Sequence, residues 1–331
     1  MKAISHRQID PPAPRRLDAP SLLLGVDGGG TKTHAVLTDG RDQVVGEGFA
    51  GPSNPLRVGV VHAAAAVREA FDRAVSEAGV RRADVAAAQV GLAGVRRADL
   101  RERVRDELVA ALGIAAVEVV TDAEIALYGA TDGEPGLVII AGTGSICCGR
   151  NARGRRVCAG GWGPLAGDEG GGIWIARRAL QSVARATDGR GPATALVESC
   201  LEYFHIEAPG DLSLAIYAPN ITNERIAGFG RYVIEAAEDG DAVAVEIVAD
   251  AGRELGLVAA TVIRQLSMGG ESFPIAYVGG VFKAGEMVMG PLREVVEPVA
   301  PRARLAPPHL SPARAAARMA RAGLPRLALA G

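Results

Sequence analysis

The sequence has few aromatic residues, few cysteines, little excess of either charge and no long apolar run. Four cysteines in 331 residues exclude a disulfide-stabilised scaffold. A net charge of −2 argues against a nucleic-acid-binding surface. No apolar run approaches the roughly 20 residues that span a bilayer. Lysine occurs only at positions 2, 32 and 283, and the last two lie beside glycine-rich turns.

The first 20 residues are polar and rich in proline. They lack the apolar segment of a signal peptide, so we expect residues 1–20 to be a disordered leader and the protein to be cytoplasmic. The rest of the chain is long enough for one large domain or two of ordinary size, each with its own core.

The stretch GVDGGGTKT, residues 25–33, nearly matches a phosphate-binding P-loop. A P-loop opens into a helix, whose N-terminus helps to hold the phosphates. Here short apolar runs follow, on either side of the turn at Asp39 and Gly40, which predicts a hairpin. The hairpin argues against a P-loop, but it leaves phosphate binding open, because backbone N–H groups of a tight glycine turn can also hold an anion.

The pattern occurs twice in the chain. Residues 136–161 again show an apolar strand, a Gly/Thr turn and two further strands. Each half then reads βββαβαβα, which predicts an α/β protein with two similar lobes, 21–131 and 132–331. The second carries a helical insertion over about 162–238, and its final helix, about 312–323, is expected to pack back on the first lobe. Facing glycine turns would line a cleft between the lobes.

Acidic residues stand at three points of this framework. Asp27 ends the first strand, where a carboxylate suits Mg²⁺ beside phosphates, or simply caps the loop. Thr121 and Glu124 fit a capping box, so Asp122 lies in the first turn of a helix. There the helix dipole should lower its pKa and leave a weak base. The alternative is an Asp that serves only the helix.

The most distinctive stretch is GGWGPLAGDEGGGIWIARRAL, residues 160–180. Glycines flank Trp162 and the pair Asp168 and Glu169, an arrangement that suits a sugar. The alternative is a flexible loop that ends in an Asp N-cap, with Trp162 and Trp174 in the core.

Taken together, the motifs resemble the actin, Hsp70 and sugar-kinase superfamily, whose two ribonuclease H-like lobes close on ATP. DGGGTKT, GPSNPLRVG, TDA, AGTGS, GGWGPLAGDEGG and VGGVFK are similar to the N-acetylglucosamine kinases of the BadF/BadG/BcrA/BcrD-type ATPase family. The resemblance spans about residues 22–323 and implies a cleft for ATP and sugar, Mg²⁺ as a cofactor, a homodimer, and no nucleic-acid or membrane partner.

The resemblance also implies roles for particular residues. Phosphate contacts are implied for Gly28, Gly29, Gly30, Thr31, Lys32, Gly142, Thr143, Gly144 and Ser145. Adenosine contacts are implied for Gly279, Gly280 and Lys283, and sugar contacts for Asn54, Asp122, Thr143, Ser145, Gly161, Trp162 and Asp168. Asp122 would be the base for the sugar 6-hydroxyl, and Asp27 would hold Mg²⁺, usually through water.

Several alternatives stay open. The choice among N-acetylglucosamine, glucosamine and N-acetylmuramic acid is not settled, because Ala159 stands before GGWG where some members have Cys. An ATPase that activates a dehydratase would need four cluster thiolates. We instead expect Cys147, Cys148, Cys158 and Cys200 to be buried reduced thiols. A sugar-sensing repressor would need a DNA-binding helix-turn-helix, which the leader is too short to supply. A non-catalytic sugar-binding protein would not need Asp122.

Overall fold

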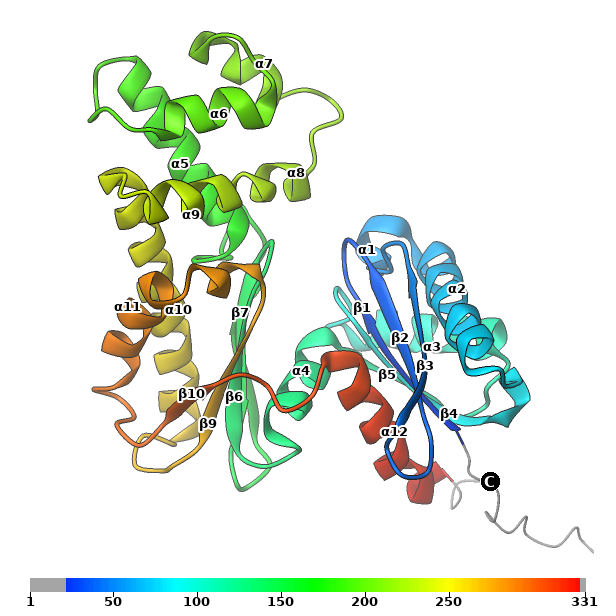
Figure 1. Cartoon of the computed structure of the whole chain (residues 1–331). Coiled ribbons are helices and arrows are strands. Elements are labelled where there is room, and N and C mark those ends of the chain that lie inside the picture. Colours follow the sequence, from blue (N-terminus) through cyan, green and yellow to red (C-terminus); the bar gives the residue numbers. More distant parts are fainter. Residues whose placement is uncertain (1–21, 328–331) are drawn as a thin grey trace, which may run out of the picture.

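The computed structural model describes residues 22–327, which form two five-stranded sheets with helices around them (Figure 1). Each sheet has three antiparallel strands followed by parallel ones, as the repeated βββαβαβα pattern predicts. No described helix is both long and apolar enough to cross a membrane.

The first sheet has the order β3-β2-β1-β4-β5. Its strands are β1 (Leu22–Gly28), β2 (Thr33–Thr38), β3 (Val44–Ala50), β4 (Val85–Leu92) and β5 (Val117–Thr121). The central strand β1 is apolar over most of its length and buried, as expected for a strand covered on both faces. Helices α2 (Val60–Ala78) and α3 (Ala98–Leu112) pack on each other. Helix α2 also packs against β2 and β3, and α3 packs against β5.

The second sheet repeats this plan in the order β10-β9-β6-β7-β8. Its strands are β6 (Gly136–Ala141), β7 (Ser145–Arg150), β8 (Arg156–Gly160), β9 (Pro274–Val278) and β10 (Arg304–Ala306). The long helix α10 (Ala242–Leu266) packs against β6, β7 and β8, and α11 (Glu286–Val296) packs along α10. A 3-10 turn over Gly280–Ala284 joins β9 to α11.

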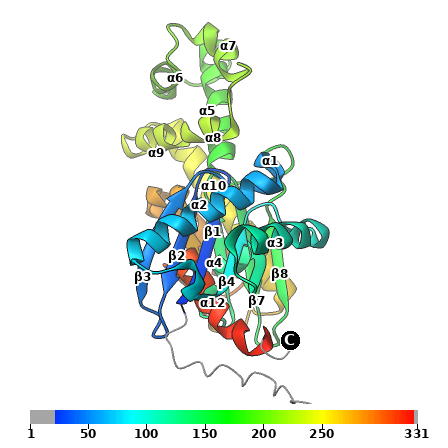
Figure 2. The ribbon, with the colours of Figure 1, turned by 90° about the vertical axis from the view of Figure 1, so that its right-hand side faces the viewer.

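Between β8 and α10 the chain forms the helical insertion. It comprises α5 (Gly172–Thr187), α6 (Leu196–Phe204), α7 (Leu212–Ile216), α8 (Asn223–Gly228) and α9 (Gly230–Glu238). Figure 2 shows these helices at one end of the molecule, beyond the sheets. Aromatic contacts among Tyr203, Phe204, Phe229 and Tyr232 hold the insertion together.

Two helices lie between the sheets, and each packs on the sheet that does not contain the strand before it. Helix α4 (Asp122–Thr131) follows a strand of the first sheet but packs mainly against β6, β7 and β9. Helix α12 (Pro312–Leu327) follows a strand of the second sheet but packs on β1, β2 and β4 (Figure 1). We call the first sheet with α1 (Pro55–Val58), α2, α3 and α12 the first lobe, and the second sheet with α4, α10, α11 and the insertion the second lobe.

Gly25 explains how closely α12 approaches the first sheet. A Cβ atom at this position would lie 2.0 Å from the carbonyl oxygen of Ala313 and 2.2 Å from the backbone N of Ala317. Only glycine leaves room for the helix backbone to rest directly on β1. Arg318 then ties the helix to the first lobe through Asp42 and to the end of α4 through Asp132.

Candidate active site

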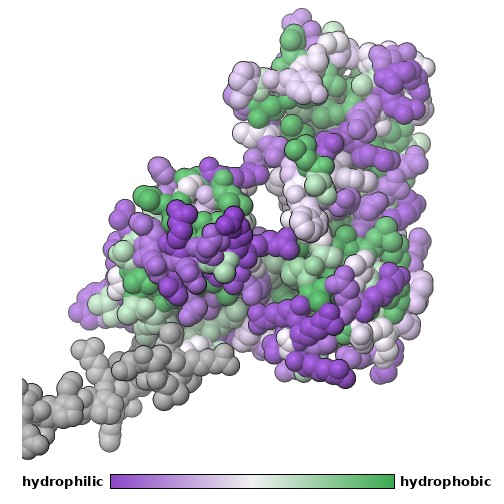
Figure 3. Space-filling view, turned by 180° about the vertical axis from the view of Figure 1, so that it is seen from behind, coloured by the Kyte–Doolittle hydropathy of each residue, from purple (hydrophilic) through white to green (hydrophobic). Residues whose placement is uncertain are grey.

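A cavity of about 670 Å³ lies between the two lobes, and Figure 3 shows the hollow between the two halves from behind. Segments from both lobes line it, so no single sheet could form it alone. Among the residues singled out from the sequence, the lining contains Gly29, Gly30, Thr31, Asn54, Asp122, Gly142, Thr143, Gly144, Ser145, Gly161, Trp162 and Asp168.

The first glycine turn leads from β1 into β2. The N–H of Gly29 donates to the carbonyl of Lys32 at 2.9 Å, and the carbonyl of Gly29 accepts from the N–H of Ser53 at 3.0 Å. Thr33 then fixes the following strand, since its hydroxyl lies 2.8 Å from that of Ser53. The turn is therefore held from both sides, while Gly30 and Thr31 face the cavity.

The second glycine turn leads from β6 into β7 and is locked to the start of α5. The N–H of Gly172 donates to Gly142 at 2.8 Å, and the N–H of Ile173 donates to Thr143 at 2.9 Å. Gly279 supports the same turn, because a Cβ there would lie 2.1 Å from the carbonyl oxygen of Ala141. Its φ of 123° is also one that side-chain-bearing residues avoid.

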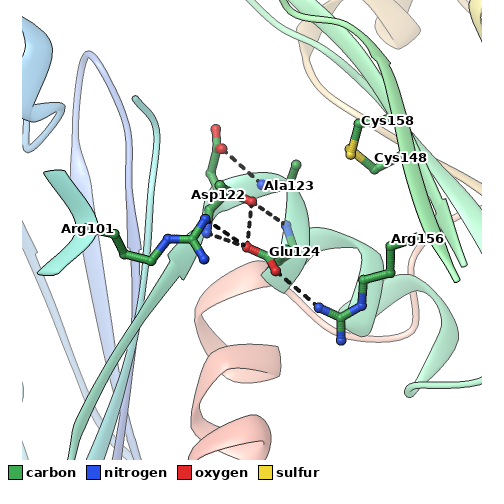
Figure 4. Close-up of a disulfide and its surroundings, with 8 residues drawn as sticks. Arg101, Asp122, Ala123, Glu124, Cys148, Arg156 and Cys158 are labelled. Carbon is green, nitrogen blue, oxygen red and sulfur yellow. Dashed lines mark hydrogen bonds and ion pairs between the residues drawn. A yellow bond between two sulfur atoms is a disulfide. The ribbon is translucent and has the colours of Figure 1, made fainter. Parts of the chain in front are cut away.

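Asp122 begins α4 at the edge of the cavity (Figure 4). The capping box is present as expected: Thr121 accepts from the N–H of Glu124 at 3.2 Å, and Glu124 accepts from the N–H of Thr121 at 2.9 Å. The N–H of Ala123 donates to Asp122 at 2.9 Å. Because Glu124 does the capping, the carboxylate of Asp122 is left for the cavity.

The electrostatics of Asp122 correct the sequence-based expectation. Burial raises its pKa, and this outweighs the N–H donors of the first helical turn that lower it. The dipole argument was therefore wrong in sign, because it neglected the loss of solvent inside the cleft. A raised pKa makes Asp122 a stronger base.

Asp27 is the last residue but one of β1, and it lies close enough to Asp122 for the two carboxylates to repel each other. The pKa of Asp27 is raised to about 6, first by burial and then by charge repulsion from Asp122, and Lys32 partly offsets this rise. Two neighbouring carboxylates with one opposing lysine leave a net negative charge here when both carboxylates are ionised. No described cluster of three His, Cys, Asp or Glu side chains could hold a metal ion alone. A cation here would therefore need ligands from elsewhere, such as phosphate and water.

The GGWG stretch forms a loop against the second glycine turn. Asp168 has a φ of 60°, and a Cβ on Gly144 would lie 2.4 Å from its carboxylate. Burial raises its pKa, although the N–H groups of Gly163 and Ser145 oppose this. Gly171, not Asp168, is the N-cap of α5, so the capping alternative was wrong. Trp162 is 71% exposed and lines the cavity, so it is not a core residue.

Other predicted site residues lie outside the lining. These are Asp27, Gly28, Lys32, Gly279, Gly280 and Lys283. Asp27 and Gly28 are in β1 immediately before the first turn, and Gly279 lies directly against the second. Asn54 does line the cavity, and it also caps the short helix α1 (Pro55–Val58) by accepting from the N–H of Leu56 at 3.0 Å.

Sequence reasoning missed the charged residues at the rim. Arg57, Arg96 and Glu224 line the cavity. Arg57 could have been found, because it follows Asn54 by three residues in the quoted motif GPSNPLRVG. Glu224 gave no signal, because it comes from the insertion.

The prediction that all four cysteines are reduced thiols was wrong for two of them. Cys148 and Cys158 form a disulfide, because the register of β7 and β8 places them directly opposite with Cα atoms 4.1 Å apart (Figure 4). Cys147 and Cys200 are free and buried as expected, and burial raises the pKa of Cys200 to about 11.

Two related sheets around a cavity lined by two glycine turns define an actin-like fold of the sugar-kinase kind. More specifically, the chain belongs to the BadF/BadG/BcrA/BcrD ATPase family, whose model matches residues 24–311.

Three known proteins illustrate the similarity. The chain is 34% identical to an N-acetylmuramic acid/N-acetylglucosamine kinase of Clostridium acetobutylicum over 260 residues, 78% of this chain and 85% of the relative. It is 32% identical over 270 residues to an N-acetyl-D-glucosamine kinase of Dictyostelium discoideum, with the same shares covered. A solved structure from Chromobacterium violaceum, of a protein proposed to be an N-acetylglucosamine kinase, aligns with a TM-score of 0.75 at 27% identity. That alignment covers 91% of this chain and 99% of the other.

Proposed function

We propose that this protein is an amino-sugar kinase that transfers the γ-phosphoryl group of ATP to the 6-hydroxyl of N-acetylglucosamine or a related amino sugar. The observation that carries the proposal is the placement of Asp122 in the same cavity as both glycine turns. The kinase names of the relatives support it.

The reaction follows from the proposed roles. The oxygen of the sugar 6-hydroxyl forms a bond to the γ-phosphorus, and the bond from that phosphorus to the β–γ bridging oxygen breaks. The hydroxyl proton goes to Asp122, and ADP leaves. Because phosphoryl transfer has a loose transition state, the protein contributes mainly position and charge.

The residues that line the cavity, and those beside it, each have a proposed task. The N–H groups of the two turns would hold the phosphates. Asn54, Gly161, Trp162 and Asp168 would orient the sugar, with Thr143 and Ser145 at the junction. Gly279, Gly280 and Lys283 would adjoin the adenosine. Asp27 would hold Mg²⁺ together with water and phosphate oxygens, and the ion would supply positive charge to the phosphates.

A coupled ADP-release assay tests the proposal. ATP and Mg²⁺ are offered with N-acetylglucosamine, glucosamine, N-acetylmuramic acid, glucose or no sugar. We expect ADP release that depends on an amino sugar, with mass spectrometry showing one added phosphoryl group. ADP release at the same rate without any sugar would instead indicate a plain ATPase. Elution as a dimer in size-exclusion chromatography would test the expected homodimer.

A further inference from the structure

Arg57 and Glu224 join the two lobes at the rim of the cavity. Arg57 is in α1 of the first lobe, and Glu224 is in α8 of the insertion. Their guanidinium and carboxylate groups form an ion pair, and both side chains are partly exposed. Both residues line the cavity.

The guanidinium of Arg57 lies directly against the first glycine turn. A Cβ built on Gly30 would be 3.3 Å from its Nη1 atom, and 3.7 Å from Oε1 of Glu224. The backbone beneath Arg57 is fixed, because its N–H donates to the carbonyl of Asn54 at 3.0 Å. Arg57 thus comes from the same short helix as a proposed sugar contact and reaches the turn proposed to hold phosphate.

The other arginines that line the cavity are engaged elsewhere. Arg97 is bound to Asp99 through two hydrogen bonds of 3.0 and 2.8 Å. Arg96 lies over the ring of Trp162, 5.7 Å from its centroid. Of the cavity-lining arginines, Arg57 is the one placed beside the phosphate turn.

We propose that Arg57 is a catalytic residue that exchanges Glu224 for the transferring phosphoryl group when ATP binds. The inference rests on the proposed function. A triphosphate carries several negative charges where Glu224 carries one, so its arrival shifts the preference of the guanidinium. Arg57 then neutralises charge on the equatorial oxygens as the 6-hydroxyl oxygen bonds to phosphorus, the proton passes to Asp122, and ADP departs.

Steady-state kinetics of four single variants, and of the double variant Arg57→Ala/Glu224→Gln, test this role. We expect Arg57→Ala to lower kcat about 10²–10³-fold, the usual effect of removing one transition-state donor, with little change in the KM of the sugar. Arg57→Lys should recover part of the loss, since it restores charge but not the planar fork. Glu224→Gln should raise kcat/KM for ATP about two- to fivefold, because it frees Arg57 from a partly exposed pair. Arg105→Ala is the matched control, since Arg105 pairs with Asp106 on α3 outside the cavity.

Binding provides a second readout. Calorimetry with ADP, Mg²⁺ and aluminium fluoride in the presence of sugar measures affinity for a mimic of the transferring group. Arg57→Ala should weaken this binding at least tenfold more than it weakens binding of ADP alone.

The outcomes separate cleanly. Wild-type protein without sugar-dependent turnover would refute the proposed function itself. Wild-type turnover that Arg57→Ala retains above about one third would overturn the role of Arg57 alone. Equal losses of kcat in Arg57→Ala and Glu224→Gln, with no further loss in the double variant, would also overturn it. That result would show that the Arg57–Glu224 ion pair only holds the two lobes together.

Discussion

At the scale of single residues, Asp27 and Asp122 are placed where an ionised carboxylate is disfavoured. Each has a pKa raised by burial, and the negative charge of Asp122 raises that of Asp27 further. Such an arrangement costs stability in the free protein and is relieved when a cation or a proton arrives. The two residues therefore offer tests in which stability and activity move in opposite directions.

Asp27→Asn should make the free protein more stable at neutral pH. The pKa of Asp27 rises from 3.8 to about 6 on folding, so between these values the folded state holds more protons than the unfolded state, and stability falls as the pH rises. Removing the carboxylate should therefore stabilise the protein by about 1–3 kcal/mol at pH 7 and hardly at all near pH 4.

Thermal melts at the two pH values, with turnover measured on the same samples, provide the check. We expect turnover of Asp27→Asn to fall while Tm at pH 7 rises. If the Tm of Asp27→Asn relative to wild type is lower at pH 7 than at pH 4, burial does not disfavour the ionised carboxylate of Asp27.

Asp122→Asn should remove the base while keeping size and fold. We expect kcat to fall about 10²–10⁴-fold, the range of general-base catalysis, with nucleotide Kd nearly unchanged. Thr121 and Glu124 still cap α4, so Tm should not fall, and the loss of a buried carboxylate should raise it at neutral pH. In the wild type, kcat should rise with pH as Asp122 loses its proton, at a pH above the usual range of Asp because its pKa is raised.

Measurements of kcat, Kd and Tm on this one variant distinguish a base from a structural Asp. Retention of more than about a tenth of wild-type kcat would refute the assignment of Asp122.

At the scale of elements, sequence patterns predicted most strands and helices because their causes are local. The change of apolar period from two to 3.6 located α2 and α10, and the Thr121–Glu124 capping box located the start of α4. What escaped prediction depends on contacts between distant segments. The fold of the insertion, for example, decides that Glu224 meets Arg57. The Cys148–Cys158 disulfide is the exception, because a hairpin that turns about Arg153 already places the two cysteines opposite each other, and only their oxidation escaped prediction.

For the candidate site, too, the features set by local sequence could be predicted, and those set by distant contacts could not. The glycine turns and the position of Asp122 at a helix start could be predicted, because a few consecutive residues determine where turns form and helices begin. The sign of the pKa shift of Asp122 could not, because desolvation depends on the opposite wall of the cavity.

The close packing of α12 on β1 gives a prediction at the scale of elements. Gly25→Ala should destabilise the protein by about 1–3 kcal/mol or more, because the new methyl group would collide with the helix backbone at Ala313 and Ala317. Gly40→Ala is the matched control, since a Cβ there meets nothing within 4 Å. Urea denaturation of both variants measures the difference, and equal midpoints would show that α12 does not rest on β1 in solution.

At the scale of the whole molecule, the lobes meet where α4 packs on α12, and through side-chain bridges around the cavity. Glu124 accepts from Arg156 of β8 at 3.1 Å and lies 3.9 Å from Arg101 of α3, so it is held from both lobes (Figure 4). Arg57–Glu224 and Arg96–Trp162 connect the lobes at the rim. Two lobes that are joined mainly along one pair of helices, with a cavity between them, can rotate about that contact.

We therefore expect the lobes to close when sugar and nucleotide bind together. Small-angle X-ray scattering should show a smaller radius of gyration with N-acetylglucosamine and a nonhydrolysable ATP analogue than with either ligand alone. An unchanged radius, with both sites shown by calorimetry to be filled, would contradict a moving cleft.

The packing of α12 on the first sheet also means that this sheet is covered only late in synthesis of the chain. The face of the first sheet that α12 covers is complete once β5 has formed, but the helix begins only at Pro312, roughly 180 residues after the end of α4. At translation rates of about 5–20 residues per second, the apolar surface around β1 stays uncovered for roughly 10–40 s. A nascent chain of this protein thus exposes apolar surface of the first sheet for most of its time on the ribosome, and we expect chaperones that recognise such surface to bind it until α12 has emerged.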